Sequence, residues 1–470
     1  MQYASASRQI EMLAKGDISA RELVDLAIER VETLDGAVNA IAVRDFDRAR
    51  AEAARADEAR AAGSAGPLLG LPVTVKEGFD VEGLVTSWGL PGDYPPARAD
   101  AVAVRRLKAA GAIVLGKSNV ATMLADWQSD NPRYGRTNNP WDRRRTPGGS
   151  SGGGAAAVAA GMVALEFGSD LAGSLRVPAA FCGVFAHRPS HGLVPMRGFA
   201  PPMVPRLPIA TDVDQAAIGP MARTAGDLEL ALRATAGPDG PRSEAFRLEL
   251  PIAAQQSLRD FRVLVVDEHP LCPTSASIRA AIADVAAHLE KAGCSLARKA
   301  ESLPDLTDLT RTFRALLMAF MGVDMPSQAY EAARGGEDFE SQAMAMSYRD
   351  WAELDRHRLE LQLGWMRLFT EFDVVVCPAT PVTAFPHDAR PFEERRLRLD
   401  GRNIGYDLLP VWSSLTNPTG LPSTTMPVGL DPDGLPIGMQ IVGGRYQDLA
   451  TLRFAALLEA ERGGFPMSAK

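Results

Sequence analysis

The run Leu71-Pro-Val-Thr-Val-Lys76-Glu77 is largely apolar until its last two residues, which are charged. Its length and its β-branched residues predict a buried strand over residues 71–75, with Lys76 where that strand meets a loop. Similar strand signals occur at residues 112–115, 262–266 and 374–377, and helical patterns separate most of them. Strands that alternate with helices form a sheet with helices on its faces. The sequence therefore predicts an α/β fold.

Helical patterns begin and end the chain. Ser19-Ala-Arg-Glu22 has the form of a capping box, and apolar residues at helical spacing follow it. Two more helices are expected over about residues 45–62 and 448–461. From about residue 275 to 370 the pattern is almost wholly helical, with apolar residues every three or four positions. We interpret this stretch as a helical insertion, or lid, that leaves the sheet.

The composition excludes several classes of protein. The 470 residues include 50 Lys plus Arg and 58 Asp plus Glu, a net charge of -8, which argues against a general nucleic-acid binder. The four cysteines include no CxxC pair, so free thiols in a reducing compartment are expected. Charged residues interrupt the N-terminal stretch, and the most apolar run, residues 155–165, is far shorter than the ~20 residues that a bilayer requires. These features predict a soluble, cytoplasmic protein.

One motif suggests nucleotide binding but stands in the wrong context. Residues Gly111-Ala-Ile-Val-Leu-Gly-Lys-Ser118 fit the P-loop pattern GxxxxGK[ST]. A phosphate-binding loop needs a strand before its first glycine and a flexible segment between its glycines. Here the intervening residues 112–115 themselves resemble a strand, so a strand end followed by a turn is the better interpretation.

Residues Gly148-Gly-Ser150-Ser151-Gly152 fit GxSxG, the nucleophile elbow of α/β hydrolases. Such an elbow follows a buried strand and needs a histidine partner. A charged, turn-rich run precedes this motif instead, although His387 remains an available partner. A His-dependent esterase is therefore a lower alternative.

Two Gly/Ser-rich loops lie near each other in the chain. The first, at residues 148–154, leads directly into a run of small side chains at residues 155–165. This run predicts a closely buried helix, which argues against a flexible linker. The second, Gly168-Ser-Asp-Leu-Ala-Gly-Ser174-Leu-Arg-Val-Pro178, contains a Gly-Ser pair. Successive backbone N–H groups in such a turn can point into one concavity and act as an oxyanion hole.

Taken together, these segments resemble the amidase signature family. The similar stretches are Leu71–Glu77, the Asn139-Pro-Trp-Asp142 run, Thr146–Gly153, Gly168–Pro178, Thr416-Asn-Pro-Thr-Gly-Leu-Pro422 and Gly434–Gly443. The resemblance extends from about residue 10 to 460 and is weakest in the helical insertion. It implies one α/β/α domain over residues 1–470, with a central mixed sheet flanked by helices. It also implies a metal-independent amidase without a cofactor, a small-molecule amide substrate, no nucleic-acid or membrane partner, and a homodimer.

The resemblance also assigns roles to individual residues. It implies that Ser174 is the nucleophile, that Ser150 is a bridging serine preceded by a cis peptide bond, and that Lys76 is the base. The resemblance places the oxyanion hole and the substrate pocket at five further residues: Leu171, Ala172, Gly173, Leu124 and Trp127. The family usually has Gly-Gly before the nucleophile, whereas this chain has Ala172-Gly173. Alanine keeps the backbone donor but narrows the allowed φ.

A lysine can act as a base only when it is neutral. Its ordinary pKa of ~10.4 lies above neutral pH, and burial can lower it by up to ~3 to 5 units. The hypothesis therefore requires Lys76 to be buried. The expected reaction is hydrolysis of a linear amide to a carboxylate and ammonia or an amine. Alternatives are the glutamine-hydrolysing subunit of a tRNA-dependent amidotransferase and a non-catalytic binding protein on the same scaffold.

Overall fold

The computed structural model describes residues 3–206, 212–323 and 325–466. A mixed sheet of 11 strands runs through this part of the chain in the order β1-β3-β2-β4-β6-β5-β12-β13-β9-β7-β8. Its strands are β1 (Ile41–Arg44), β2 (Pro72–Lys76), β3 (Ile113–Ser118), β4 (Leu165–Asp170), β5 (Phe185–Arg188), β6 (Ala217–Ala222), β7 (Arg262–Val265), β8 (Ser295–Ala297), β9 (Val374–Pro378), β12 (Ser423–Leu430) and β13 (Pro436–Val442). Strands β10 (Arg396–Leu399) and β11 (Arg402–Gly405) form a separate hairpin. The predicted α/β fold with a central mixed sheet is confirmed.

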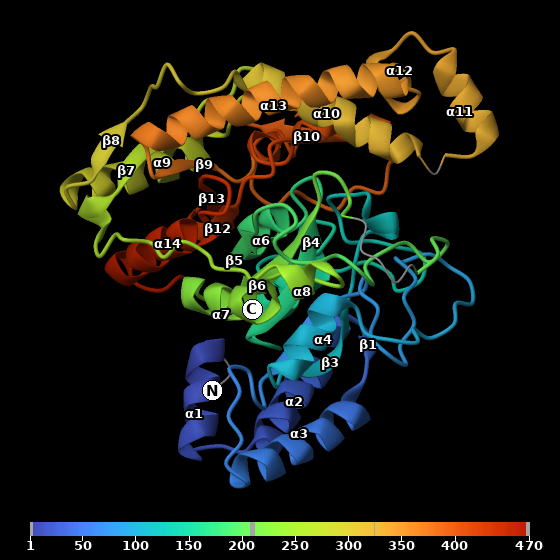
Figure 1. The fold of residues 1–470 in the computed structure, drawn as a ribbon, viewed down its shortest axis with the longest axis vertical. Coiled ribbons are helices and arrows are strands. Elements are labelled where there is room, and N and C mark those ends of the chain that lie inside the picture. Colours follow the sequence, from blue (N-terminus) through green and yellow to red (C-terminus); the bar gives the residue numbers. More distant parts are fainter. Residues whose placement is uncertain (1–2, 207–211, 324, 467–470) are drawn as a thin grey trace.

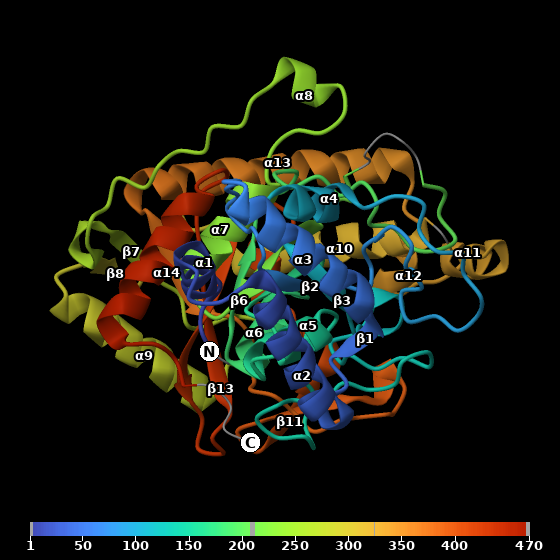
Figure 2. The same ribbon diagram turned by 90° about the horizontal axis from the view of Figure 1, so that it is seen from below.

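Helices cover both faces of the sheet (Figures 1 and 2). The α-helices are α1 (Ala6–Lys15), α2 (Ala20–Val38), α3 (Phe46–Ala61), α4 (Val102–Ala109), α5 (Gly152–Ala159), α6 (Arg176–Cys182), α7 (Ala225–Thr235), α8 (Arg242–Ala245), α9 (Ala276–Lys291), α10 (Leu306–Gly322), α11 (Ser327–Arg334), α12 (Phe339–Met344), α13 (Tyr348–Glu371) and α14 (Asp448–Arg462). The predicted capping box is present, since the Ser19 hydroxyl accepts from the Glu22 N–H and the Glu22 carboxylate accepts from the Ser19 N–H. No helix among the described residues is long and apolar enough to cross a bilayer.

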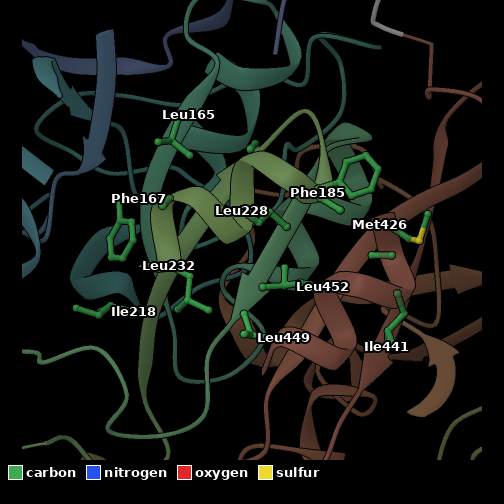
Figure 3. Close-up of a cluster of buried hydrophobic side chains, with 14 of the residues drawn as sticks. Leu165, Phe167, Phe185, Ile218, Leu228, Leu232, Met426, Ile441, Leu449 and Leu452 are labelled. Atoms are coloured by element: carbon green, nitrogen blue, oxygen red, sulfur yellow. The ribbon is translucent and has the colours of Figure 1, made fainter. Parts of the chain in front are cut away.

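The alternation of side chains along the strands divides the core into two layers. In β7, Val263 and Val265 join one hydrophobic cluster, whereas Leu264 joins another. Figure 3 shows the first cluster, in which leucines of α7 and α14 lie among apolar side chains of the neighbouring strands. Successive residues of a strand point to opposite faces, so each strand contributes to both layers. The catalytic candidates therefore stand on a sheet that is packed on both sides.

Two predicted elements differ from the structure. The helix expected over residues 155–165 ends earlier, because α5 stops at Ala159 and Leu165 already begins β4. The small side chains of α5 allow this helix to pack closely against the backbone of its neighbours, including β4. The stretch 275–370 is not wholly helical: β8 pairs with β7 at the sheet edge, and α9 packs on the sheet. Only α10 to α13 leave the sheet, as Figure 1 shows.

Candidate active site

Lys76 ends strand β2 and lies in the interior with no exposed surface. Its Nζ donates to the Ser150 Oγ at 2.7 Å and to the Ser169 Oγ at 2.9 Å. Ser169 lies near the end of β4, which pairs with β2 in parallel, and Ser150 lies in the loop before α5. The two serine contacts hold the amine in one position.

Burial lowers the pKa of Lys76 to about 7, although the nearby carboxylates of Asp170 and Glu166 act in the opposite direction. Burial also raises the pKa of Glu166 to about 7, against the hydroxyls of Ser118 and Thr74 that donate to it. A protonated Glu166 carries no charge that would hold a proton on Lys76. Burial therefore favours the neutral form of the Lys76 amine.

Ser150 and Ser174 lie on adjacent backbone segments. The Ser151 N–H donates to the Ser174 carbonyl at 3.3 Å, and the Gly149–Ser150 peptide bond is cis, as the resemblance implied. Ser150 is 1% exposed and Ser174 is 6% exposed. Within the described residues the Ser174 hydroxyl has no hydrogen-bond partner. Ser150 thus lies on the lysine side and is buried, whereas Ser174 is the more accessible of the two.

The segment that carries Ser174 is organised by the buried carboxylate of Asp170, at the end of β4. This carboxylate accepts from the backbone N–H groups of Gly173 at 2.9 Å and Leu175 at 3.1 Å, and from the guanidinium of Arg176 at 2.8 and 2.9 Å. Burial alone would raise the pKa of Asp170, but Arg176 and Arg188 outweigh it and hold the carboxyl pKa well below its usual range. Asp170 therefore stays ionised and fixes the turn before helix α6.

The same arginine connects this turn to the C-terminal part of the chain. The Arg176 Nη1 donates to the Thr416 Oγ1 at 2.8 Å, and its Nη2 donates to the Asn417 Oδ1 at 2.5 Å. The Asn417 Nδ2 in turn donates to the Leu171 carbonyl. The turn that carries Ser174 is thus held from both sides.

Breaking the Asp170 contacts is expected to destabilise the fold strongly. Asp170→Asn leaves two buried arginines without their counter-ion, which costs about 3–5 kcal/mol in comparable buried pairs. Asp373→Asn is the matched control, because Asp373 binds Arg262 in a similar way but at the surface, where such pairs contribute about 0–1 kcal/mol. Urea unfolding of the purified variants measures both changes. Equal losses of free energy of unfolding in the two variants would contradict the expectation.

The predicted oxyanion residues lie together in this turn, but their backbone donors are not equivalent. The Gly173 N–H is already bonded to Asp170, so it is not a free donor, and the prediction needs correction there. Among the described residues, the N–H groups of Leu171, Ala172 and Ser174 have no acceptor. Gly173 has a φ of 90°, and a Cβ there would lie 2.5 Å from the Ser413 Oγ, so this position requires glycine. Ala172 has no positive φ, so its departure from the family pattern introduces no backbone strain.

The two predicted pocket residues occupy different places. Leu124 is half-buried, has a φ of 57° and packs beside Gly78, next to the end of β2. Trp127 is also half-buried, and its Nε1 donates to the Ala172 carbonyl at 2.8 Å. Its ring lies 5.7 Å from Phe392 and 5.5 Å from Tyr406, measured between centroids. Trp127 therefore contacts the turn that carries Ser174 directly, which the sequence pattern did not predict.

Several functional contacts were missed from the sequence. Ser169 and Asp170 stand inside the quoted Gly168–Pro178 motif, so their position was a signal, but their partners are set by folding. Asn417 lies in the quoted C-terminal motif, 246 residues from Leu171. No local pattern specifies a contact across such a separation.

The competing motifs are not supported by the structure. Residues 113–118 form strand β3, and the Lys117 Nζ is buried and donates to the Val85 carbonyl at 2.6 Å, so no phosphate-binding loop exists there. No strand leads into Ser150, and in the described part of the chain no histidine ring is hydrogen-bonded to Ser150 or Ser174. Among the same residues no group of three His, Cys, Asp or Glu side chains could hold a metal ion.

Comparisons with known proteins agree on one family. A family model described as Amidase matches residues 22–452. The putative amidase AmiB2 of Mycobacterium tuberculosis (strain ATCC 25618 / H37Rv) is 34% identical and covers 98% of this chain and 96% of its own. The A subunit of the glutamyl-tRNA(Gln) amidotransferase of Synechococcus sp. (strain CC9605) is 32% identical over 96% of this chain and 94% of its own. A solved structure is also similar: the inhibitor-bound form of a vestigial protein complex that reveals the evolutionary origins of an s-triazine catabolic enzyme. It has a TM-score of 0.84 at 31% identity, covering 99% of this chain and 100% of that one.

Proposed function

The chain belongs to the amidase family, and from this membership we propose that it hydrolyses a linear carboxylic amide through an acyl-enzyme on Ser174. The observation that carries the proposal is the buried Lys76 amine, 2.7 Å from the Ser150 Oγ, beside the turn that presents Ser174. A serine hydroxyl is a weak nucleophile and needs a base within hydrogen-bond reach. Lys76 supplies that base, and Ser150 relays the proton.

The first half of the reaction forms the acyl-enzyme. The Ser174 hydroxyl, which has no hydrogen-bond partner in the described part of the chain, turns toward Ser150. Neutral Lys76 then takes the proton of Ser150 as Ser150 takes the proton of Ser174, and the Ser174 oxygen attacks the amide carbon. The free N–H groups of the turn, Ala172 foremost, stabilise the negative oxygen. Removal of one such donor costs about 10²–10³ in kcat in other enzymes. The proton then passes back through Ser150 to the nitrogen, which leaves as ammonia or an amine.

The second half consumes water. The relay deprotonates a water molecule, whose oxygen attacks the acyl carbon, and the proton returns to Ser174. The products are the carboxylic acid and the free enzyme, so atoms and charge balance without any further reactant. Esters and carbamates contain the same electrophilic carbon and are accessible to the same nucleophile.

The rate is expected to rise with pH until Lys76 is neutral. Because the pKa of Lys76 is about 7, the neutral form falls about tenfold for each pH unit below that value. kcat/KM should therefore rise about tenfold from pH 5 to 6 and level off above about pH 8. Initial rates in a constant-ionic-strength buffer series measure this profile. A flat profile from pH 5 to 9, or one that falls across it, would be incompatible with a lysine base.

A turnover screen across aliphatic amides, aryl amides, carbamates and esters, with mass detection of the acid and amine, tests the activity and its substrate class. Hydrolysis of amides that depends on Ser174 supports the proposal. The second candidate is a glutamine-hydrolysing amidotransferase subunit, favoured by the 32% identity to the Synechococcus protein. Glutaminase activity that appears only with partner subunits and tRNA would reverse the order. Cytoplasmic location and a homodimer remain proposals, which cell fractionation and light scattering test.

A further inference from the structure

We propose that Trp127 is a positioning residue that aims the oxyanion donors of the nucleophile turn, an inference that rests on the proposed amidase activity. The resemblance placed Trp127 in the substrate pocket as a lining residue. Its indole N–H instead donates to a backbone carbonyl, that of Ala172, at 2.8 Å. This contact ties the indole to the turn that carries Ser174, in addition to any pocket surface that the ring offers.

The orientation of each peptide group in the turn follows from its anchors. In a trans peptide the C=O and the next N–H point in opposite directions. The Ala172–Gly173 peptide is held at both ends, its oxygen by Trp127 and its N–H by Asp170. The preceding peptide has its oxygen, that of Leu171, held by Asn417.

The Ala172 N–H is the one polar group of these two peptides that has no anchor in the described part of the chain. It belongs to the same peptide group as the Leu171 carbonyl, so it points away from Asn417. It has no acceptor among the described residues. The two peptide groups share the Ala172 Cα, so the Trp127 and Asp170 bonds on one side and the Asn417 bond on the other fix the position of this Cα and of the free N–H beside it. Removing the Trp127 bond leaves the Ala172–Gly173 peptide anchored through its N–H alone.

Trp127 is itself fixed by a distant segment. The Tyr406 hydroxyl donates to the neighbouring Asp126 Oδ1 at 2.7 Å, and the Arg395 Nη1 donates to the Asp126 Oδ2 at 2.6 Å. The rings of Phe392 and Tyr406 pack against the indole. The indole therefore has a rigid support, which a positioning group requires because small misplacements at a reacting centre cost large factors in rate.

The test removes the indole N–H while keeping the ring. Trp127→Phe deletes the donor, and 3-benzothienylalanine at position 127 replaces the N–H by sulfur in a ring of the same shape. The readout is the second-order rate at which a rhodamine-linked fluorophosphonate labels Ser174, because the phosphoryl oxygen of that adduct occupies the oxyanion site. Labelling needs no knowledge of the natural substrate. We expect both variants to label about 10–10²-fold more slowly than the unmodified protein.

Trp141 provides a matched control. Its Nε1 also donates to a backbone carbonyl, that of Cys182, at 2.8 Å, and its ring packs against Phe465. The same two replacements at position 141 should leave the labelling rate within about twofold. The pH midpoint of labelling should stay unchanged in all variants, because the proton relay is intact. A melting curve for each protein ensures that labelling is measured on folded chains.

Distinct outcomes separate this inference from the proposed function. Wild-type labelling rates in both position-127 variants, an equal loss in the position-141 variants, or a shifted pH midpoint would overturn the positioning role. Failure of the unmodified protein to label at Ser174 would instead overturn the proposed function. Slow labelling confined to the position-127 variants, with an unchanged midpoint, supports the inference.

Discussion

Ser174→Ala is expected to reduce amide hydrolysis by about 10⁴-fold or more, because the attacking oxygen is removed and no acyl-enzyme can form. The change deletes one atom from a residue whose hydroxyl has no hydrogen-bond partner in the described part of the chain. The fold should therefore survive, and the melting temperature should stay close to that of the unmodified protein. Initial rates on the best amide from the substrate screen, together with a melting curve, measure both effects.

Active-site labelling locates the nucleophile independently of any substrate. A fluorophosphonate followed by peptide mass mapping should modify Ser174, and Ser174→Ala should abolish the label. Ser190→Ala serves as the control, since the buried Ser190 hydroxyl donates to Asp448 and has no contact with the nucleophile turn. If the label instead lay on Ser150, and if labelling depended on a histidine, the nucleophile-elbow interpretation would hold and the proposed role of Ser174 would be wrong.

Lys76→Met is expected to lower kcat/KM by about 10²–10⁴-fold, the usual contribution of a general base. Methionine has a similar length and no charge, so it can fill the buried space of the lysine side chain, and the loss should come from the missing amine. The rise in rate around pH 7 should disappear with it, because the group that titrates there is gone. Rates at pH 6, 7, 8 and 9 compare the two profiles directly.

Lys117→Met is the matched control for this variant. Lys117 is equally buried, lies opposite Val75 on the neighbouring strand β3, and has a pKa lowered by burial to about 8. Its amine contacts the Val85 carbonyl and the Thr86 hydroxyl, and neither candidate catalytic serine. The control should keep the pH profile of the unmodified protein. If the rise in rate around pH 7 survived in Lys76→Met and were lost in Lys117→Met, the base would be Lys117 and the proposed role of Lys76 would be wrong.

The fold could be predicted where the sequence pattern is local. The strand signals at residues 71–75, 112–115, 262–266 and 374–377 correspond to β2, β3, β7 and β9. Strand β4 was missed because residues 155–165 were interpreted as one helix, although Gly161, with a φ of 71°, turns the chain between α5 and β4. Strand β8 was missed because three residues between two helices show no periodicity.

The candidate site could be predicted only as a set of residue types. The resemblance selected Lys76, Ser150 and Ser174, and the structure brings their segments together around a buried amine. The donor that Gly173 was expected to provide is used by Asp170, because a buried carboxylate must have its oxygens hydrogen-bonded. Sequence patterns indicate which groups are present, whereas hydrogen-bond competition inside the folded chain decides which of them stay free.

The bond between Asn417 and the turn at Leu171 joins residues that are 246 positions apart. At a synthesis rate of about 5–20 residues per second, the turn leaves the ribosome about 12–50 s before its anchor exists. During translation Ser174 therefore emerges long before the groups that hold its turn. A nascent chain of this protein should stay inert toward other amides around it until its final third has been made.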